Sequence, residues 1–367
     1  MELHVVDMHT AGEPVRIVTG GYPELLGATI LEKRREAREL YDHLRRALML
    51  EPRGHAGMYG VIPVKPSTPD TVIGALFTHN EGYSTMCGHA TIALGRWLVE
   101  SGSVTATAPE TQFALELPCG TVRVTCRLEG GRVISTAFDS VPAFLSHRDV
   151  ALAVDGLGTV CLDIAYGGAF YAVLHSSTLG LDFFRTPIAD LVRAASAITD
   201  AVRASVPVTH PEAEDLGFLY GTILTDDAPI SVPTYNLCVF AEGQIDRSPT
   251  GSGVTARMAR DYARGLIMAE RERTFYGPTG IPFQARVIAS TDGPVPAAVT
   301  VRVSGTSAFS GRSTFVIEKD DPLGHGFALP LSFNDLMKRD PNTHLSADKA
   351  QAQCLVSPRH DVDWSIR

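Results

Sequence analysis

One pattern of residues occurs twice in this chain, at a separation of about 160 positions. In each copy short apolar runs flank an Asp and a Gly, and Asp7 and Gly12 recur as Asp163 and Gly168, both 156 positions later. The repeats of solenoid proteins are about 20–50 residues long, so this spacing indicates duplication of a whole domain. The chain is therefore expected to fold as two similar halves.

Each copy also contains a glycine-rich segment with the features of a helix start. Cys87 is followed by small residues and by Gly102, 15 positions later, and Thr250 is followed in the same way by Gly265. Thr250 thus occupies in the second half the place of Cys87 in the first. If the two halves face each other, both helix N-termini meet in one cleft. Their unpaired N–H groups and positive dipole ends would favour a carboxylate there.

The remaining sequence divides into predicted strands and helices around these two points. Amphipathic helices are predicted at 28–49 and 188–204, and the charges of the first are expected to face solvent. Short apolar runs bounded by Gly, Pro and Asn predict strands at 3–18 with a turn at Gly12, 59–64, 72–78, 113–117, 120–127, 133–138, 161–174, 219–224, 234–240, 297–304 and 311–319. From the length of 367 residues we expect a first domain at 1–155, a second at 156–330 and a polar C-terminal extension at 331–367.

Charge and composition exclude several classes of protein. The net charge of −9 and the lack of a long basic run argue against nucleic-acid binding. No run of eighteen apolar residues and no signal-peptide pattern occurs, so no membrane span is expected. The six cysteines are scattered as in reduced, cytoplasmic proteins, and no metal-ligand spacing is present. Four of them are expected to pack within strands: Cys119, Cys126, Cys161 and Cys238.

Cys87 is the residue whose position has the clearest chemical meaning. A thiol at the start of a helix lies close to unpaired N–H groups, which lower its pKa and make it available as a base. The alternative is that Cys87 is simply a small buried apolar residue, as most free cysteines are. The local sequence leaves both interpretations open.

Five segments together carry a resemblance to a known family. They are Asp-Met-His-Thr-Ala-Gly-Glu-Pro at 7–14, Pro-Arg-Gly-His at 52–55, His-Asn-Glu-Gly-Tyr-Ser-Thr-Met-Cys-Gly-His at 79–89, Asp-Ile-Ala-Tyr-Gly-Gly-Ala-Phe-Tyr at 163–171 and Asp-Arg-Ser-Pro-Thr-Gly-Ser-Gly at 246–253. With them the chain resembles the proline racemase family, relatives by fold of diaminopimelate epimerase, and within it the branch that dehydrates trans-3-hydroxy-L-proline. In the racemase and 4-hydroxyproline epimerase branches the position of Thr250 is a second cysteine, whereas threonine is the pattern of the dehydratase branch.

The resemblance implies an α+β fold of two pseudo-symmetric domains like those of diaminopimelate epimerase. Each domain would be a curved mixed sheet wrapped around a central helix, with the active site in the cleft between them. It also implies that Cys87 is the proton acceptor, with Thr250 at the corresponding position of the second half, and that Asp246 pairs with the ring ammonium of a small imino acid. The substrate carboxylate would be held by Gly88, His89, Gly251 and Ser252. No cofactor is required, and a homodimer is left open.

The pair Cys87 and Thr250 favours elimination over racemisation. A racemase needs an acid–base group on each face of the α-carbon, and the alcohol of Thr250 has a pKa far above neutrality. In trans-3-hydroxy-L-proline the hydroxyl and the α-hydrogen share one ring face, so a single base suffices for syn elimination of water. The Cys87 thiol or His89 would protonate the departing hydroxyl. The product would be a Δ2 enamine that tautomerises to Δ1-pyrroline-2-carboxylate.

Three other functions are kept as alternatives. The first is a proline or hydroxyproline racemase or epimerase, and the second is an imino-acid binding protein without turnover. The third is a nicotinamide dehydrogenase, because Gly251-x-Gly253-x-x-Ala256 matches a loose dinucleotide fingerprint. In that fingerprint a strand runs directly into the glycines, whereas Asp-Arg-Ser-Pro intervenes here, so the match is weak.

Overall fold

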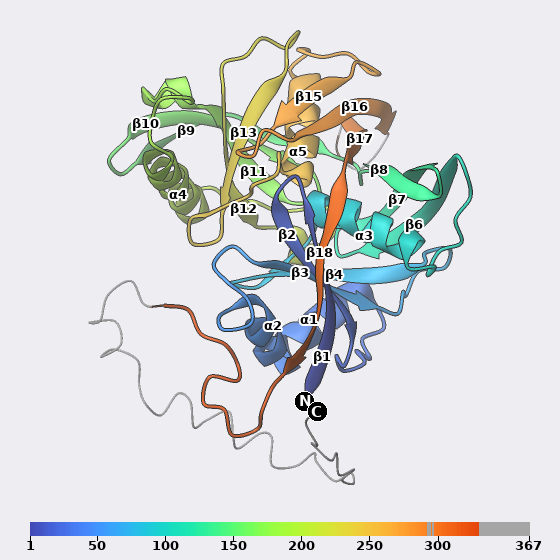
Figure 1. The fold of residues 1–367 in the computed structure, drawn as a ribbon. Helices are drawn as coiled ribbons and strands as arrows, with labels where there is room; N and C mark the ends of the chain where they lie inside the picture. The colour runs from blue at the N-terminus through green and yellow to red at the C-terminus, as the bar shows by residue number, and fades with distance from the viewer. Residues whose placement is uncertain (292–294, 296, 330–367) are drawn as a thin grey trace, which may run out of the picture. The chain divides into compact units, whose positions relative to one another are not determined.

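Figure 1 shows the fold in a computed structural model, which describes residues 1–291, 295 and 297–329. Within the described chain, eighteen strands are joined by hydrogen bonds into one mixed sheet network, accompanied by five α-helices. The strands are β1 (Glu2–Thr10), β2 (Glu13–Gly20), β3 (Tyr59–Val64), β4 (Ile73–His79), β5 (Tyr83–Ser84), β6 (Glu110–Leu117), β7 (Gly120–Glu129), β8 (Arg132–Asp139), β9 (Phe144–Val154), β10 (Gly158–Tyr166), β11 (Phe170–His175), β12 (Leu219–Thr225), β13 (Thr234–Phe240), β14 (Gln244–Ile245), β15 (Arg273–Tyr276), β16 (Pro282–Thr291), β17 (Ala298–Gly305) and β18 (Ser307–Val316). The helices are α1 (Ile30–Leu40), α2 (Asp42–Met49), α3 (Gly88–Glu100), α4 (Ile188–Ser205) and α5 (Gly251–Ala263).

The strand pairings follow the same order in both halves of the sequence. In the first half β2–β3 is parallel, β3–β4 antiparallel, β4–β6 parallel and β6–β7–β8 antiparallel. In the second half β11–β12 is parallel, β12–β13 antiparallel, β13–β15 parallel and β15–β16–β17 antiparallel. Helix α3 follows β5 and helix α5 follows β14, which is the same place in each set. The repeat seen in the sequence therefore recurs as a repeated topology.

Three antiparallel strand pairs connect the two sets. β8 pairs with β17, β9 with β10, and β18 with β1. β9, at the end of the first half, thus pairs with β10 of the second half. β18, the last strand, pairs with β1, the first strand of the chain. The boundary predicted between residues 155 and 156 falls in the turn between β9 and β10.

Helices α3 and α5 are surrounded by strands in Figure 1. Ten of the thirteen residues of α3 and eleven of the thirteen of α5 are buried, whereas a surface helix buries one stripe. Small residues permit this close packing: a Cβ on Gly95 would lie 2.7 Å from the Thr136 Cγ2 atom on β8. Cys126 on β7 is also within reach of that position, at 3.4 Å. The starts of both helices are therefore fixed by a packed core.

The helix predicted at 28–49 is two helices, α1 and α2, separated at Tyr41. The prediction that its charges face solvent is wrong for Lys33, Arg34 and Arg45, which are 5–7% exposed. Arg34 donates to the Tyr83 carbonyl at 2.7 Å, and Arg45 donates to the carbonyls of His79 and Asn80. Helical spacing identifies a charged face, but it does not reveal that strand carbonyls lie opposite that face.

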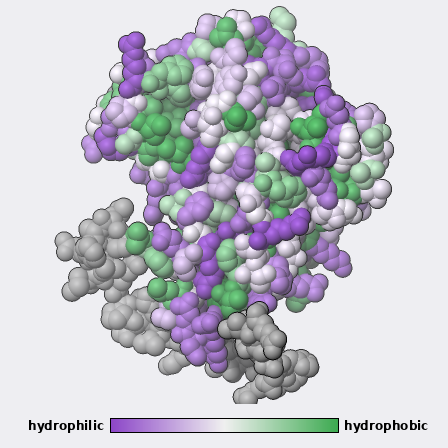
Figure 2. All heavy atoms as spheres, in the orientation of Figure 1, coloured by the Kyte–Doolittle hydropathy of each residue, from purple (hydrophilic) through white to green (hydrophobic). Residues whose placement is uncertain are grey.

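The other predicted strands and the helix at 188–204 are present, with boundaries shifted by a few residues. The sequence patterns did not single out β5, β9, β14, β15 and β16. Figure 2 shows hydrophilic and hydrophobic residues intermixed over the visible face. None of the described helices is long and apolar enough to cross a membrane. The extension predicted at 331–367 lies outside the described residues.

Candidate active site

The N-termini of α3 and α5 meet at Gly88 and Gly251. A Cβ on Gly88 would lie 2.5 Å from the Cα of Gly251, and a Cβ on Gly251 would lie 2.7 Å from the Cα of Gly88. Real Cβ atoms do not approach backbone this closely, so both positions require glycine. The predicted convergence of two helix starts is confirmed, and with it two sets of backbone N–H groups at one point.

Cys87 and Thr250 are the capping residues of these two helices. The Cys87 Sγ atom accepts a hydrogen bond from the Ala90 amide at 3.4 Å. Thr250 makes no such bond and has φ of 67°, a value that β-branched residues rarely adopt. Its Oγ1 atom is buried and finds no hydrogen-bond partner among the described residues. A strained residue with an unsatisfied buried hydroxyl is a feature typical of ligand sites.

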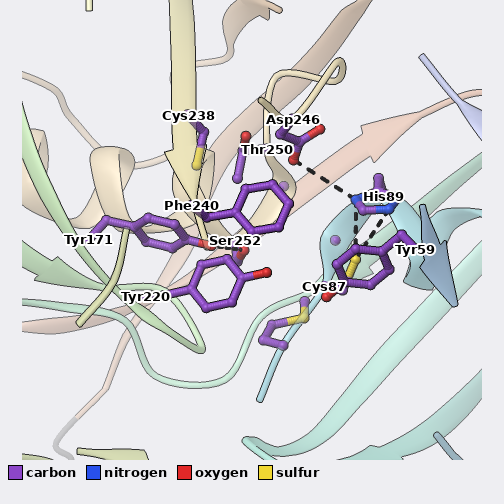
Figure 3. Close-up of a pocket in the computed structure, with 13 residues that line it drawn as sticks. Tyr59, Cys87, His89, Tyr171, Tyr220, Cys238, Phe240, Asp246, Thr250 and Ser252 are labelled. Atoms are coloured by element: carbon purple, nitrogen blue, oxygen red, sulfur yellow. Dashed lines mark hydrogen bonds and ion pairs between the residues drawn. The ribbon is translucent and has the colours of Figure 1, made fainter. Parts of the chain in front are cut away.

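A small pocket lies at the two helix starts (Figure 3). All seven predicted site residues line it: Cys87, Gly88, His89, Asp246, Thr250, Gly251 and Ser252. The structure thus brings together residues that are up to 165 positions apart in the sequence.

Cys87, His89 and Asp246 form a row along one side of the pocket (Figure 3). The Cys87 Sγ atom is 3.1 Å from Nδ1 of His89, and the same nitrogen is 3.9 Å from Oδ2 of Asp246. Burial lowers the pKa of His89 to about 4, although the Asp246 charge acts in the opposite direction. The imidazole is therefore neutral at pH 7.

The expected low pKa of Cys87 is not found. Burial raises the pKa of this thiol well above its usual value, and the nearby Asp246 charge adds to the rise. The hydrogen bond from the Ala90 amide lowers the pKa but has the smaller effect. The sequence argument considered only the helix N-terminus, whereas desolvation inside the closed pocket dominates. With its pKa raised in this way, Cys87 is a thiol rather than a thiolate at neutral pH.

Sequence reasoning missed the aromatic wall of the pocket. The additional lining residues are Tyr59, Met86, Tyr171, Tyr220, Cys238 and Phe240. All of them except Met86 lie within predicted strands, where a core aromatic and a pocket aromatic look alike. The Tyr171 hydroxyl is hydrogen-bonded to Ser252 Oγ at 2.7 Å, so it supports a predicted site residue. Cys238, which was expected only to pack in a strand, supplies a second thiol in the pocket.

Glu13 is another buried group that the sequence reasoning did not single out, although it lies in the segment 7–14. Its side chain is fully buried and accepts a hydrogen bond from the Arg247 amide at 2.7 Å. Burial and the Asp246 charge raise its pKa well above the usual value. Glu13, the first residue of β2, thereby joins this strand to the loop that carries Asp246.

A metal ion has no candidate site in the part of the chain that the structure describes. No group of three or more His, Cys, Asp or Glu side chains is arranged there to hold one.

The fold is a large mixed sheet with few helices, and its pocket places a thiol where two helix starts meet. The chain belongs to the proline racemase family, since the model described as "Proline racemase" matches residues 5–328. It is 52% identical to trans-L-3-hydroxyproline dehydratase of Xenopus tropicalis over 331 residues, which cover 89% of this chain and 95% of the relative. It is 50% identical to trans-3-hydroxy-L-proline dehydratase of Homo sapiens over 334 residues, 89% and 94% of the two chains.

Two further proteins show the breadth of the family. The 3-hydroxyproline 2-epimerase of Burkholderia multivorans is 40% identical over 328 residues, which cover 89% of this chain and 97% of the relative. A crystal structure of a hydroxyproline epimerase from Agrobacterium vitis, with bound trans-4-hydroxy-L-proline, matches the fold with a TM-score of 0.85. That protein is 25% identical, and the match covers 89% of this chain and 95% of the other.

Proposed function

We propose that the protein dehydrates trans-3-hydroxy-L-proline to Δ1-pyrroline-2-carboxylate, through the Δ2 enamine. The observation that carries this proposal is the pairing of a thiol, Cys87, with an alcohol, Thr250, at the two helix starts. A thiol can take and return a proton near neutral pH, and an alcohol cannot. The dehydratases that are about half identical to this chain support the same reaction.

The substrate carboxylate would bind where the two helices begin. The backbone N–H groups of Gly88, His89, Gly251 and Ser252 belong to the first turns of α3 and α5, which have no partners within their own helices. As the α-proton leaves, charge moves onto the carboxylate, and these donors are already in position to stabilise it. A preorganised donor of this kind is worth about 3–4 kcal/mol when it is deleted.

Asp246 would hold the ring nitrogen of the substrate as an ammonium. Asp246 is 4% exposed, and its Oδ1 atom accepts a hydrogen bond from the Ser248 amide at 2.8 Å. An ion pair in this dry pocket orients the ring and balances the negative charge that develops next to Cys87. No cofactor takes part in this scheme.

The proton abstraction would begin with the thiol of Cys87 and the neutral ring of His89. Transfer of the thiol proton across their 3.1 Å contact gives a thiolate, which the substrate ammonium and the helix dipoles favour once the substrate is bound. The thiolate removes the α-proton and the C3–O bond breaks. The hydroxyl takes a proton from the resulting Cys87 thiol or from the protonated His89 ring and leaves as water from the same ring face. Thr250 faces the substrate as the counterpart of Cys87 without exchanging protons.

A racemase or epimerase remains the second candidate, because Cys238 places another thiol in the pocket and an epimerase is 40% identical to the chain. Incubation of the protein in D2O with trans-3-hydroxy-L-proline, trans-4-hydroxy-L-proline and L-proline separates the two functions. Imine formation from the first substrate alone supports dehydration. Incorporation of deuterium at the α-carbon with inverted configuration in the other two would overturn it.

A non-enzymatic imino-acid binding protein is tested by the reactivity of Cys87. If Cys87 is the base, alkylation of this residue should abolish turnover, and pyrrole-2-carboxylate should protect it. Tight binding of trans-3-hydroxy-L-proline without any turnover would instead indicate a binding protein. For a nicotinamide dehydrogenase, NAD should raise the melting temperature, and we expect no such shift.

We also propose that the repeated topology marks two pseudo-symmetric domains, at 1–155 and 156–330, each a curved sheet around α3 or α5, with the substrate in the cleft between them. The equivalent order of pairings in the two halves supports this division, and the β9–β10 and β18–β1 pairs link the halves. The extension at 331–367, the homodimer and the cytoplasmic location stay predictions from the sequence.

A further inference from the structure

A second pocket, larger than the one that holds Cys87, has no role in the proposed reaction. The residues that form its walls include Cys119, Pro142, Phe144, Tyr166, His210 and Glu212. They are all different from the residues that line the candidate active site. We call this cavity the Tyr166 pocket.

Tyr166 supplies the pocket with a hydroxyl that lacks a partner. The residue is 1% exposed, and its hydroxyl finds no hydrogen-bond partner among the residues that the structure describes. Its ring is held in place by Phe144, at 5.1 Å between centroids, and by His210, at 4.7 Å. Burial raises the pKa of Tyr166, so the hydroxyl keeps its proton at neutral pH and can donate it. A buried donor without an acceptor needs an explanation, and a ligand in the pocket would provide one.

His210 and Glu212 add two further polar groups. The Glu212 amide donates to Nδ1 of His210 at 3.3 Å, so the proton of the neutral ring is on Nε2. Burial lowers the pKa of His210, which keeps the ring neutral at pH 7. Among the described residues that line the pocket, Glu212 is then the one that carries a charge. Glu212 is exposed whereas Tyr166 is buried, so the charge is nearer to solvent than the hydroxyl.

This distribution of groups fits a small zwitterion with an apolar side chain. A carboxylate can accept hydrogen bonds from the neutral donors at the buried end, and an ammonium can pair with Glu212. Apolar carbons would pack on Phe144 and Pro142, as in most small-molecule pockets. A simple anion would find no cation here, and a simple amine would leave the Tyr166 hydroxyl without an acceptor.

One turn connects the Tyr166 pocket with the candidate active site. Tyr166 ends β10, and two glycines follow it. A Cβ on Gly167 would lie 2.2 Å from the carbonyl oxygen of Ser252, at the start of α5. A Cβ on Gly168 would lie 2.5 Å from Cγ of Met86. Because Ser252 and Met86 line the active site, a ligand that holds the Tyr166 hydroxyl acts on a turn in direct contact with that site.

We propose that the Tyr166 pocket binds a free α-amino acid with an apolar side chain, and that its occupancy changes the affinity of the active site for imino acids. The ligand carboxylate accepts a hydrogen bond from Tyr166, and the ligand ammonium pairs with Glu212. The coupling is reciprocal, as linkage requires. The coupling rests on the proposed imino-acid site, whereas binding in the Tyr166 pocket does not.

Equilibrium dialysis of the full chain with labelled L-leucine and L-proline tests the binding, with pyrrole-2-carboxylate present to occupy the active site. We expect one equivalent of amino acid to bind. Isopentylamine and isocaproate, which lack the carboxylate or the ammonium of leucine, should compete at least tenfold more weakly than leucine. Failure of both amino acids to bind would overturn the site, and equal competition by either analogue would overturn the zwitterion.

Two variants test the place of binding. Tyr166→Phe should weaken binding about 10- to 100-fold, since a hydrogen bond to a charged group contributes on that scale. The midpoint of denaturant unfolding should stay unchanged, because the hydroxyl has no partner among the described residues. Glu212→Gln should also weaken binding, whereas Glu214→Gln, which removes an exposed carboxylate outside the pocket, should not. Equal binding by wild type and Tyr166→Phe would overturn the assignment of the pocket.

The affinity for pyrrole-2-carboxylate, measured with and without the bound amino acid, tests the coupling. We expect a change of at least about fivefold in the wild type, the lower end of typical coupling between sites. The same amino acid concentration should have no such effect on Tyr166→Phe. An unchanged affinity in the wild type would overturn the coupling. Wild-type protein that does not bind pyrrole-2-carboxylate at all would instead refute the proposed imino-acid site.

Discussion

Gly88 and Gly251 are in backbone contact, so that a Cβ on Gly251 would lie 2.7 Å from the Cα of Gly88. This contact fixes the distance between the two helix starts and therefore the geometry of the proposed carboxylate site. Because backbone atoms cannot yield as the end of a flexible side chain can, the two helices have to move apart if either glycine gains a side chain.

Gly251→Ala should separate the helix starts and destabilise the protein by about 1–3 kcal/mol, the usual cost of overpacking. We expect a lower midpoint of denaturant unfolding and at least a 100-fold loss of kcat/KM. Gly82→Ala is the matched control, because its Cβ would meet nothing within 4 Å. Equal behaviour of the two variants would show that the helix contact does not set the site.

Cys87→Ser should abolish elimination of water, because an alcohol cannot act as the base at neutral pH. The imine product is measured through its reduction or through its reaction with an aldehyde reagent. Circular dichroism checks that the variant is folded. Substantial remaining activity in a folded variant contradicts a mechanism with Cys87 as the single base. Cys238→Ser is the companion variant, and we expect it to retain dehydration, since Cys238 has no step in the proposed reaction.

Thr250→Cys restores a second thiol at the helix start that faces Cys87. If Thr250 is the counterpart of Cys87, this variant should gain exchange of the α-hydrogen of L-proline with inversion of configuration. The measurement is the appearance of α-deuterated D-proline in D2O by NMR and chiral chromatography. Loss of dehydration without any such gain would show that the Thr250 hydroxyl has a role of its own.

His89 makes the stability of the protein dependent on pH. Burial lowers the pKa of His89 from about 6.5 to about 4. Between these two pH values the unfolded chain therefore binds a proton at His89 that the folded chain does not bind. The stabilising contribution is present above pH 6.5 and is lost as the pH falls toward 4. Between pH 7 and pH 5 the loss is on the order of 2 kcal/mol.

Urea unfolding at pH 7 and pH 5 measures this loss. His79, whose pKa is lowered to about 3, contributes in the same direction, so His89→Asn should reduce the difference without removing it. An identical difference in wild type and His89→Asn would contradict the neutral, buried state of His89.

Arg45 should be important for stability even though the sequence suggested a solvent-exposed charge. Its guanidinium donates to the carbonyls of His79 and Asn80 and to the Asp42 carboxylate. Arg45→Ala leaves these acceptors without a donor, at a cost of about 2–5 kcal/mol in the free energy of unfolding. Arg193→Ala, on the exposed face of α4, should change the free energy of unfolding by less than about 0.5 kcal/mol. Similar losses in both variants would contradict a structural role for the buried arginine.

The sequence by itself determined the duplication, the two helix starts and the identity of their capping residues. A recurrence of 156 positions and the glycines after Cys87 and Thr250 are local features, and local backbone preferences are enough to convert them into helix N-termini. The same features placed Gly88 and Gly251 correctly at the point of convergence.

Only the tertiary structure decided the protonation states and the walls of the pocket. The thiol of Cys87 has a raised pKa because burial outweighs the helix start, and the number of atoms that surround a residue cannot be read from its sequence neighbours. Tyr59, Tyr220 and Cys238 reach the pocket from β3, β12 and β13, strands whose patterns resemble ordinary core packing. Their contribution depends on the pairing of distant strands, which brings side chains together through contacts that no local pattern records.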